Sequence, residues 1–189
     1  MKIIKNPSSK NWQEVLKRPT QTVDDIEATV NEILAEVRSK GDQAIEKYTS
    51  LFDGIAIKNI EVSSEEIQQA EKEISAELKE AIQLAKENIT KFHAAQKTDR
   101  VEVETQNGVK CWQEKRPIPK VGLYIPGGSA PLFSTILMLA VPAQLAGCQE
   151  IVLCTPPNKK GNIHPAVLYT ANLCGVTKIF KVGGIQAIA

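Results

Sequence analysis

The sequence has few of the residues that build metal sites and disulfides. It contains four cysteines and two histidines among 189 residues. No two cysteines form a CxxC pair, and neither His93 nor His164 has a cysteine or another histidine at ligand spacing. We therefore expect no complete zinc site within this chain. The cysteines are interpreted as small buried residues of a protein from a reducing compartment.

Long apolar runs and a strong net charge are also absent. No stretch approaches the roughly 20 apolar residues of a membrane span, and the start, MKIIKNPSSKNW, has no apolar core of a secretory signal. The net charge is only +1, which gives no argument for nucleic acid or a membrane surface as a partner. We expect a cytoplasmic protein without either partner.

Two nucleotide-binding motifs are missing as well. There is no GxxxxGK[ST], which argues against a P-loop NTPase. There is no GxGxxG after a strand, and the run EIVLC ends in Thr155-Pro156-Pro157 without the acid that usually holds the ribose of NAD. No histidine or acid is placed to activate a loop serine, so no catalytic set is assigned.

What the chain does contain divides into two parts. Apolar residues make up 42% and charged residues 24%, which is typical of a globular protein. Residues 1–119 carry a net charge of −3, whereas residues 120–189 carry +4 and are richer in glycine and proline. We place a domain boundary in the stretch RPIPK, which ends at Lys120.

The first part, 1–119, is predicted to be mainly helical. Apolar spacing indicates a helix that ends at Gly41, a shorter helix that ends near Gly54, and a long helical stretch that opens with a capping box at Ser63 and is divided at Ser75. The alternating run IAIKNIEV, 55–62, predicts a strand. Farther along, Asn-Gly between two alternating runs predicts a β-hairpin that links or covers the two parts.

The second part, 120–189, is predicted to be a parallel βαβαβ unit. Short apolar runs at 120–125, 150–154 and 178–182 are typical of strands that are covered on both faces. We expect Ser134 to cap a first helix up to Ala146 and a second helix to begin near Pro165. Right-handed crossovers would give a sheet with helices on its faces.

A ligand site is predicted at the carboxyl edge of this sheet. The loop PGGS follows the first strand and Gly-Gly follows the third, and glycines allow a ligand to approach the backbone closely. Helix N-termini nearby favour anions such as phosphate. Tyr124 at the end of the first strand and Gln186 after the third are the candidate contacts. Tight turns and a half-buried tyrosine would explain the same residues without a ligand.

These residues also carry a resemblance to a known family. The stretch VGLYIPGGSAPLFSTILMLAVPAQLAGCQEIVLCTPP closely resembles the signature region of histidinol dehydrogenases, and LCGVTKIFKVGGIQAIA resembles a later segment of the same family. VRSKGDQAIEKYTSLFD, FHAAQKT and VETQNGVKC are similar to the family too. The resemblance covers almost the whole chain.

The resemblance implies a fold and an activity. Members of the family are zinc-containing homodimers that use NAD to oxidise L-histidinol through histidinaldehyde to L-histidine, the last step of histidine biosynthesis. Their core is an incomplete Rossmann-like arrangement related to the aldehyde-dehydrogenase fold. By the same resemblance, Tyr124 and Gln186 are NAD contacts.

Family chains are more than twice as long, so the zinc ligands and the acid–base residues are expected beyond residue 189. No catalytic or metal residue is assigned here, and we expect the 189-residue chain to be inactive alone. One alternative is a non-catalytic binding or assembly module that kept the fold. Another is a different oxidoreductase of aldehyde-dehydrogenase-like fold, which would need a nucleophilic cysteine farther along.

Overall fold

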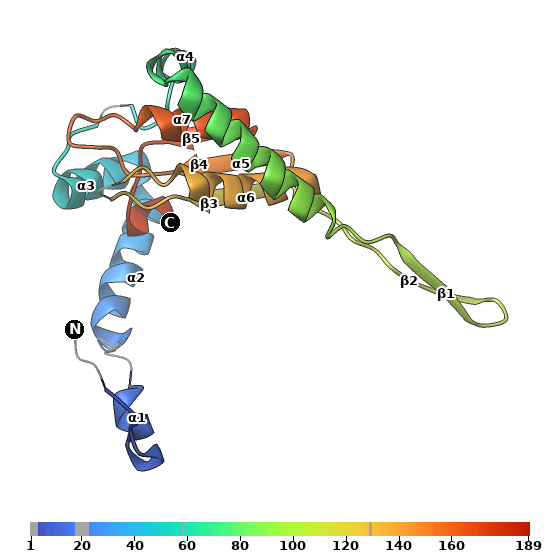
Figure 1. The fold of residues 1–189 in the computed structure, drawn as a ribbon. Coiled ribbons are helices and arrows are strands. Elements are labelled where there is room, and N and C mark those ends of the chain that lie inside the picture. Colours follow the sequence, from blue (N-terminus) through green and yellow to red (C-terminus); the bar gives the residue numbers. More distant parts are fainter. Residues whose placement is uncertain (1–3, 18–22, 58, 129) are drawn as a thin grey trace.

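The computed structural model describes residues 4–17, 23–57, 59–128 and 130–189. Its elements run in the order η1 (Ser9–Asn11), α1 (Trp12–Val15), α2 (Val23–Lys40), α3 (Asp42–Asp53), α4 (Ser64–Glu73), α5 (Ala76–Ala94), β1 (Val101–Gln106), β2 (Val109–Gln113), β3 (Lys120–Tyr124), α6 (Phe133–Ala146), β4 (Glu150–Cys154), α7 (Pro165–Leu173), β5 (Lys178–Phe180) and η2 (Ile185–Ala187). Figure 1 shows them as a helical body with a long hairpin arm. The α/β class is confirmed.

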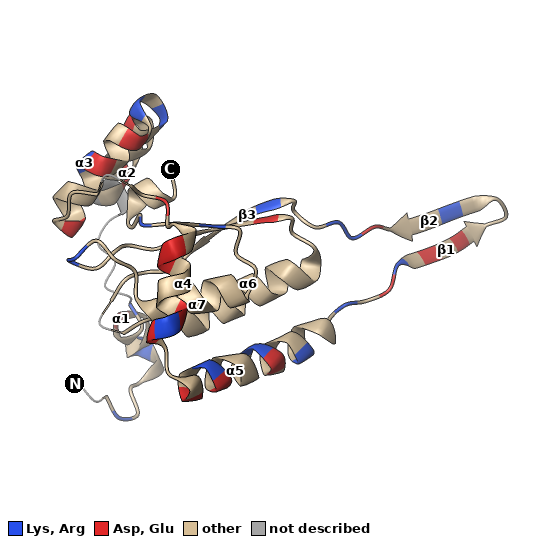
Figure 2. Cartoon of the chain, turned by 90° about the horizontal axis from the view of Figure 1, so that it is seen from above, with Lys and Arg blue, Asp and Glu red and all other residues tan. Residues whose placement is uncertain are grey.

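The parallel unit of the second part is confirmed. Strands β3, β4 and β5 pair in parallel in the order β3-β4-β5, with Leu123 opposite Leu153 and Leu153 opposite Ile179. Helices α6 and α7 connect them and lie together on one face of the sheet, with α4 and α5 packed outside them (Figure 2). Apolar side chains of both helices and of the strands therefore share one core.

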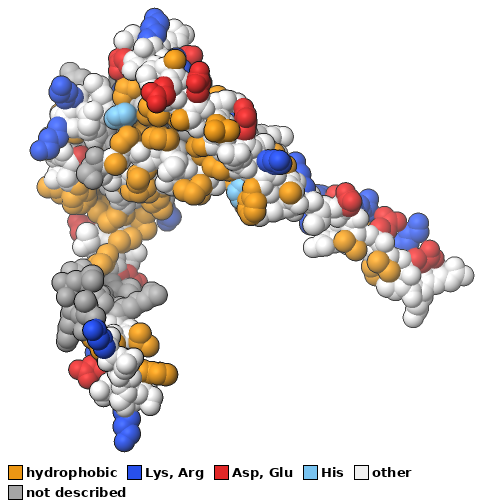
Figure 3. All heavy atoms as spheres, in the orientation of Figure 1, with side chains coloured by type: hydrophobic (Ala, Val, Ile, Leu, Met, Phe, Trp, Pro, Cys, Tyr) orange, Lys and Arg blue, Asp and Glu red, His pale blue; other side chains and the backbone are white. Residues whose placement is uncertain are grey.

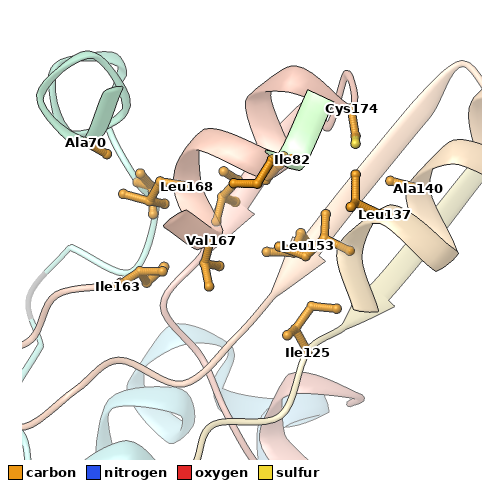
Figure 4. Close-up of a cluster of buried hydrophobic side chains, with 14 of the residues drawn as sticks. Ala70, Ile82, Ile125, Leu137, Ala140, Leu153, Ile163, Val167, Leu168 and Cys174 are labelled. Carbon is orange, nitrogen blue, oxygen red and sulfur yellow. The ribbon is translucent and has the colours of Figure 1, made fainter. Parts of the chain in front are cut away.

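That core draws on both parts of the chain. Ala70 of α4 and Ile82 of α5 pack in the same buried cluster as Leu137 of α6, Leu153 of β4 and Leu168 of α7 (Figure 4). Ile82, Leu137 and Leu153 are each no more than 1% exposed. Burying such side chains stabilises a fold by about 1.5–3 kcal/mol each. The domain boundary between residues 119 and 120 remains a prediction. Helices α4 and α5 of the first part cover the helices of the second part.

The helix boundaries of the first part follow its local sequence signals. Ser63 and Glu66 form the predicted capping box, because each side chain accepts a hydrogen bond from the other residue's backbone N–H, at 3.2 and 2.9 Å. Ser75 separates α4 from α5 and caps α5 through the N–H of Leu78. Gly54 ends α3 with a positive φ of 70°.

Two local predictions were wrong. The run 55–62 forms no regular strand among its described residues, because only its end reaches the sheet, where the N–H of Val62 donates to the carbonyl of Ile179. Ser134 does not cap α6. The helix begins at Phe133, with Leu132 rather than Ser134 at its cap position, and Ser134 lies inside its first turn. After the last Gly-Gly the chain forms the short 3₁₀ turn η2.

The predicted hairpin is confirmed, with Gly108 at a φ of 84° in its turn. Every residue of β1 and β2 is exposed, and the hairpin projects away from the body (Figure 1). It links α5 to β3 but covers neither part.

Candidate functional site

The carboxyl edge of the parallel sheet brings three loops together. Beyond the ends of the strands, the N–H of Ile125 still donates to Cys154 and the N–H of Thr155 to Phe180, at 2.9 and 3.1 Å. The PGGS loop, the Thr155-Pro-Pro loop and the Gly183-Gly184 turn therefore begin side by side, as the sequence predicted for the two Gly-Gly segments.

A hydrogen bond joins the first strand to the last turn. The backbone N–H of Gly184 donates to Oη of Tyr124 at 3.1 Å, across 60 residues of sequence. Tyr124 is half-buried, and because its oxygen acts as the acceptor in this bond, its O–H can still donate a hydrogen bond to another group. The structure thus places Tyr124 next to the turn that leads into Gln186.

Gln186 is buried in a way that the sequence did not foresee. Its side chain is 2% exposed, and neither its Nε2 nor its Oε1 has a hydrogen-bond partner among the described residues. A buried amide without partners costs about 1–3 kcal/mol. The amide therefore has unused hydrogen-bonding capacity, and its Oε1 lies 2.8 Å from where a Cβ on Gly184 would stand.

Two glycines at the carboxyl edge of the sheet are needed for close packing between loops, and a third leaves the backbone accessible. A Cβ on Gly127 would lie 2.6 Å from Cγ of Pro156, and one on Gly183 would lie 2.5 Å from Cβ of the same proline. Pro156 is thus packed against both Gly-Gly segments. Gly128, by contrast, has nothing within 4 Å of its Cβ position, so it is the glycine that leaves the backbone open.

A small cavity of about 200 Å³ lies between the first two loops. Its described lining consists of Ile125 to Gly128, Ala130 to Leu132, Thr155 to Asn158, and Asn162, Ile163, His164 and Val167. No described side chain caps α6, and in its first turn the N–H of Thr135 donates to the carbonyl of Leu132 at 3.1 Å, whereas the N–H groups of Phe133 and Ser134 have no partner among the described residues. Free N–H groups at a helix start favour a phosphate or another anion.

Sequence reasoning assigned no role to the polar side chains of this cavity, and two of them, His164 and Asn158, already have hydrogen-bond partners. Nδ1 of His164 accepts the N–H of Ala166 and caps α7, at 3.2 Å. Oδ1 of Asn158 accepts from the N–H groups of Lys160 and Asn162 in a tight turn. The sequence signals were the histidine before Pro165 and the asparagine after two prolines.

Helices α2 and α3 hold η2, and with it Gln186, in place. Ile185 of η2 packs against a small core of Ile33, Ala44 and Tyr48. Glu36 of α2 accepts hydrogen bonds from Lys40, Lys47 and the hydroxyl of Tyr48, which lower its pKa to about 2. This carboxylate ties α2 to α3 and so stiffens the support of η2.

A partly buried ion pair fixes the segment before Gly183. Nζ of Lys181 lies 2.6 Å from Oε1 of Glu66, and the lysine is 8% exposed. Burial by itself would raise the pKa of Glu66, but the hydrogen bonds from Lys181 and from the N–H of Ser63 outweigh it, so that the pKa is lowered. Helix α4 is thereby anchored to the strand end that carries the Gly-Gly turn.

Nothing in the described part of the chain assembles a metal site or a nucleophile. No group of three or more histidine, cysteine or acidic residues lies together in these ranges. All four cysteines are free thiols, and burial raises the pKa of Cys154, so the thiol at the edge stays protonated at neutral pH. These residues do not fit zinc, whereas the free amide of Gln186, the open backbone at Gly128 and the start of α6 fit a phosphate-bearing cofactor.

Comparisons with known proteins give one consistent result. The family model described as histidinol dehydrogenase matches residues 16–189. A histidinol dehydrogenase of Bacteroides thetaiotaomicron is 58% identical over all 189 residues, which are 44% of that relative. One from Escherichia coli is 50% identical over 183 residues, which are 96% of this chain and 41% of the relative.

A solved structure agrees in fold. The crystal structure of histidinol dehydrogenase from Elizabethkingia anophelis superposes with a TM-score of 0.90 at 52% identity, over 97% of this chain and 42% of that one. The chain therefore spans less than half the length of the relatives it matches. In the described ranges, none of the helices has both the length and the apolar character to cross a bilayer.

Proposed function

The chain belongs to the histidinol dehydrogenase family, and we propose that it forms the cofactor side of an NAD-dependent oxidation of L-histidinol. The observation that carries the proposal is the contact of Tyr124 with Gly184, which joins the end of β3 to the Gly183-Gly184 turn at one sheet edge. Such edges are where open α/β sheets bind nucleotides.

Within this proposal, each element of the edge has a task. The start of α6 and the open backbone at Gly128 receive a phosphate of NAD. The hydroxyl of Tyr124 and the amide of Gln186 bind polar groups of the cofactor. The amide of Gln186, which has no partner among the described residues, thereby gains hydrogen bonds. NAD supplies the hydride acceptor, and the chain's own residues orient it.

The substrate, the overall reaction, the metal and the oligomeric state are proposed from membership of the family. The proposed overall reaction converts L-histidinol, two NAD⁺ and one water to L-histidine, two NADH and the released protons through histidinaldehyde, as the last step of histidine biosynthesis. The zinc ligands and acid–base residues are proposed to lie in polypeptide outside residues 1–189, since no metal group assembles in the described part of this chain. A homodimer in the cytoplasm is proposed on the same basis.

The proposal is tested with a chimera of residues 1–189 joined to the part of the B. thetaiotaomicron relative that the match does not cover. We expect the chimera to form two NADH per L-histidinol in the presence of zinc, and the 189-residue chain alone to form none. A folded chimera that binds neither NAD nor histidinol would favour the alternative, a non-catalytic binding or assembly module.

A further inference from the structure

The hydroxyl of Thr155 is a polar group at the carboxyl edge that no described residue uses. Thr155 is 5% exposed and lines the cavity of about 200 Å³ between the loops that follow β3 and β4. Side chains alternate along a strand, so Thr155 lies on the same face as Leu153, toward α6 and α7. Its Oγ1 makes no hydrogen bond among the described residues, and it is not one of their fully enclosed atoms without a partner. The oxygen is therefore accessible from the cavity.

The backbone holds this hydroxyl in one place. The N–H of Thr155 donates to the carbonyl of Phe180 at 3.1 Å. Pro156 follows directly, and a residue before a proline is kept in an extended conformation. Pro156 is itself packed against Gly127 and Gly183. Because threonine is branched at Cβ, its side chain has few rotamers. The position of Oγ1 is thus set before a ligand binds.

Backbone donors adjoin the same cavity. Leu132 lines the cavity and directly precedes the first turn of α6, a helix of 14 residues. The N–H groups of Phe133 and Ser134 in this turn have no partner among the described residues. Such groups point back from the helix start and carry its partial positive charge. The first turn of α6 and the hydroxyl of Thr155 therefore offer hydrogen-bond donors to one cavity from two loops.

The surroundings of the cavity favour a negative charge. Its described lining contains no aspartate or glutamate. In the second part of the chain the only acid is Glu150, which lies at the opposite end of β4 and pairs with Lys120 at 3.0 Å. Lys159 and Lys160 lie in the turn beside the lining, and neither forms an ion pair with a described residue. Figure 3 shows carboxylates over α4 and along the hairpin arm, and none over α6.

The cavity has the size of a subsite. Its volume is about 200 Å³, whereas pockets for whole drug-sized ligands have roughly 300–1,000 Å³. One water molecule takes roughly 30 Å³, so the cavity has room for a phosphate group but not for a dinucleotide. A hydroxyl, free N–H groups of a helix start and the missing acids together suit a phosphate, which is an anion rich in acceptors.

We propose that Thr155 is a further cofactor-binding residue, whose hydroxyl donates a hydrogen bond to the diphosphate of NAD together with the N–H groups of Phe133 and Ser134. This inference rests on the proposed function and names the part of NAD that the cavity holds. In standard dinucleotide-binding sheets the loop after the first strand holds the diphosphate, and an acid after the second strand holds a ribose. Here the loops after β3 and β4 both hold the diphosphate, which accounts for a hydroxyl in the place of that acid.

Binding measurements test the subsite without activity. Thr155→Val in the chimera removes the hydroxyl and keeps the shape, and it should raise the Kd for NAD and for ADP at least about ten-fold, the effect of one hydrogen bond to a charged group. Thr155→Ser keeps a hydroxyl and should stay within about three-fold of the parent. The Kd for adenosine, which has no phosphate, should change by less than about two-fold in both variants. Thr170→Val is the control, because the Thr170 hydroxyl donates to the carbonyl of Ala166 at 2.7 Å within α7, and it should leave all three affinities unchanged.

The melting temperature separates a binding role from a structural one. Since the hydroxyl of Thr155 has no partner in the described part of the chain, Thr155→Val should leave the melting temperature unchanged or raise it. A lower melting temperature with unchanged Kd values would overturn the proposal. An equal loss of affinity for adenosine would also overturn it, because the effect would not lie at the phosphate. Thr155-dependent binding of inorganic pyrophosphate beside Thr155-independent binding of NAD would do the same, since the cavity would then hold a free anion.

Amide hydrogen exchange tests the subsite without a variant, in the chimera or, if the chimera does not fold, in the 189-residue chain. NAD and ADP should slow the exchange of the Phe133 and Ser134 amides about ten-fold or more, and adenosine should not. Unchanged exchange at both amides with NAD bound would contradict the subsite. Thr155-dependent binding of NAD with no oxidation of L-histidinol would retain the subsite and reject the proposed function. Oxidation with a Kd for NAD that Thr155→Val leaves unchanged would retain the function and reject the subsite.

Discussion

The hydroxyl of Tyr124 and the backbone N–H of Gly184 lie 3.1 Å apart, and this hydrogen bond joins the end of β3 to the turn before Gln186. The tyrosine thus belongs both to the structure of the edge and to its proposed chemistry. Removal of the Tyr124 hydroxyl should weaken cofactor binding, because it removes a proposed cofactor contact and also frees the N–H of Gly184 in the turn.

Tyr124→Phe in the chimera should raise the KM for NAD about 5- to 30-fold, the loss of one or two hydrogen bonds at about 1 kcal/mol each. The KM for L-histidinol should stay within about two-fold. Tyr169→Phe on α7 is the matched control, since Tyr169 lies away from the edge. Steady-state kinetics with each substrate varied make the measurement, and an unchanged KM for NAD would remove Tyr124 from the site.

Gly127→Ala should destabilise the 189-residue chain by about 1–3 kcal/mol, because the new methyl group would overlap Cγ of Pro156. Gly128→Ala is the control and should change stability by no more than about 0.5 kcal/mol, since its Cβ position is open. Urea unfolding measures both. In a Pro156→Ala background, which removes Cγ, the cost of Gly127→Ala should shrink. An undiminished cost there would mean that Pro156 is not the obstacle.

Acid should loosen the support of η2. The pKa of Glu36 is lowered to about 2, from an ordinary value of 4.5, by its hydrogen bonds from Lys40, Lys47 and Tyr48. A carboxyl with a depressed pKa stabilises the fold above its unfolded pKa, and this contribution disappears as the pH falls from about 4.5 toward 2. Glu36→Gln should therefore flatten the acid side of the stability profile. Thermal melts from pH 7 to 3 would show the same slope in both proteins if Glu36 has no such role.

Removal of either partner from the Lys181–Glu66 pair should have unequal effects. Glu66→Gln keeps an acceptor for the N–H of Ser63 but leaves the buried ammonium of Lys181 without a counter-charge. Lys181→Met removes the buried charge and leaves a carboxylate that water can reach. We expect Glu66→Gln to be the more destabilising, by about 1–2 kcal/mol. Chemical unfolding of the two variants decides this, with Glu65→Gln as control, and the reverse order would contradict the account.

The sequence predicted those elements that are specified by local chemistry. Ser63 and Glu66 predict a helix start, and Asn107-Gly108 predicts a hairpin turn. The three short apolar runs predict a parallel sheet. The structure contains all three features. It mispredicted residues 55–62, where alternation favours a strand but only the last residues find an edge to pair with. Pairing is a tertiary event that a local pattern does not contain.

The site was predictable in place but not in detail. Gly-Gly after two strands located the edge, and the structure brings Tyr124 and the turn before Gln186 together there. The packing of Pro156 against Gly127 and Gly183 could not be read from the sequence, because it depends on the spacing between loops. Neither could the burial of the Gln186 amide. The roles of Tyr124 and Gln186 in binding NAD remain predictions.

The most direct test of the account is Gln186→Met in the chimera, measured for stability without NAD and for the KM of NAD. Methionine keeps the volume but removes two buried, unpartnered polar atoms. The account predicts an unchanged or higher melting temperature together with a KM for NAD raised at least about ten-fold, which is roughly 1.4 kcal/mol. A lower melting temperature with an unchanged KM for NAD would make Gln186 a structural residue and would contradict the proposed cofactor site.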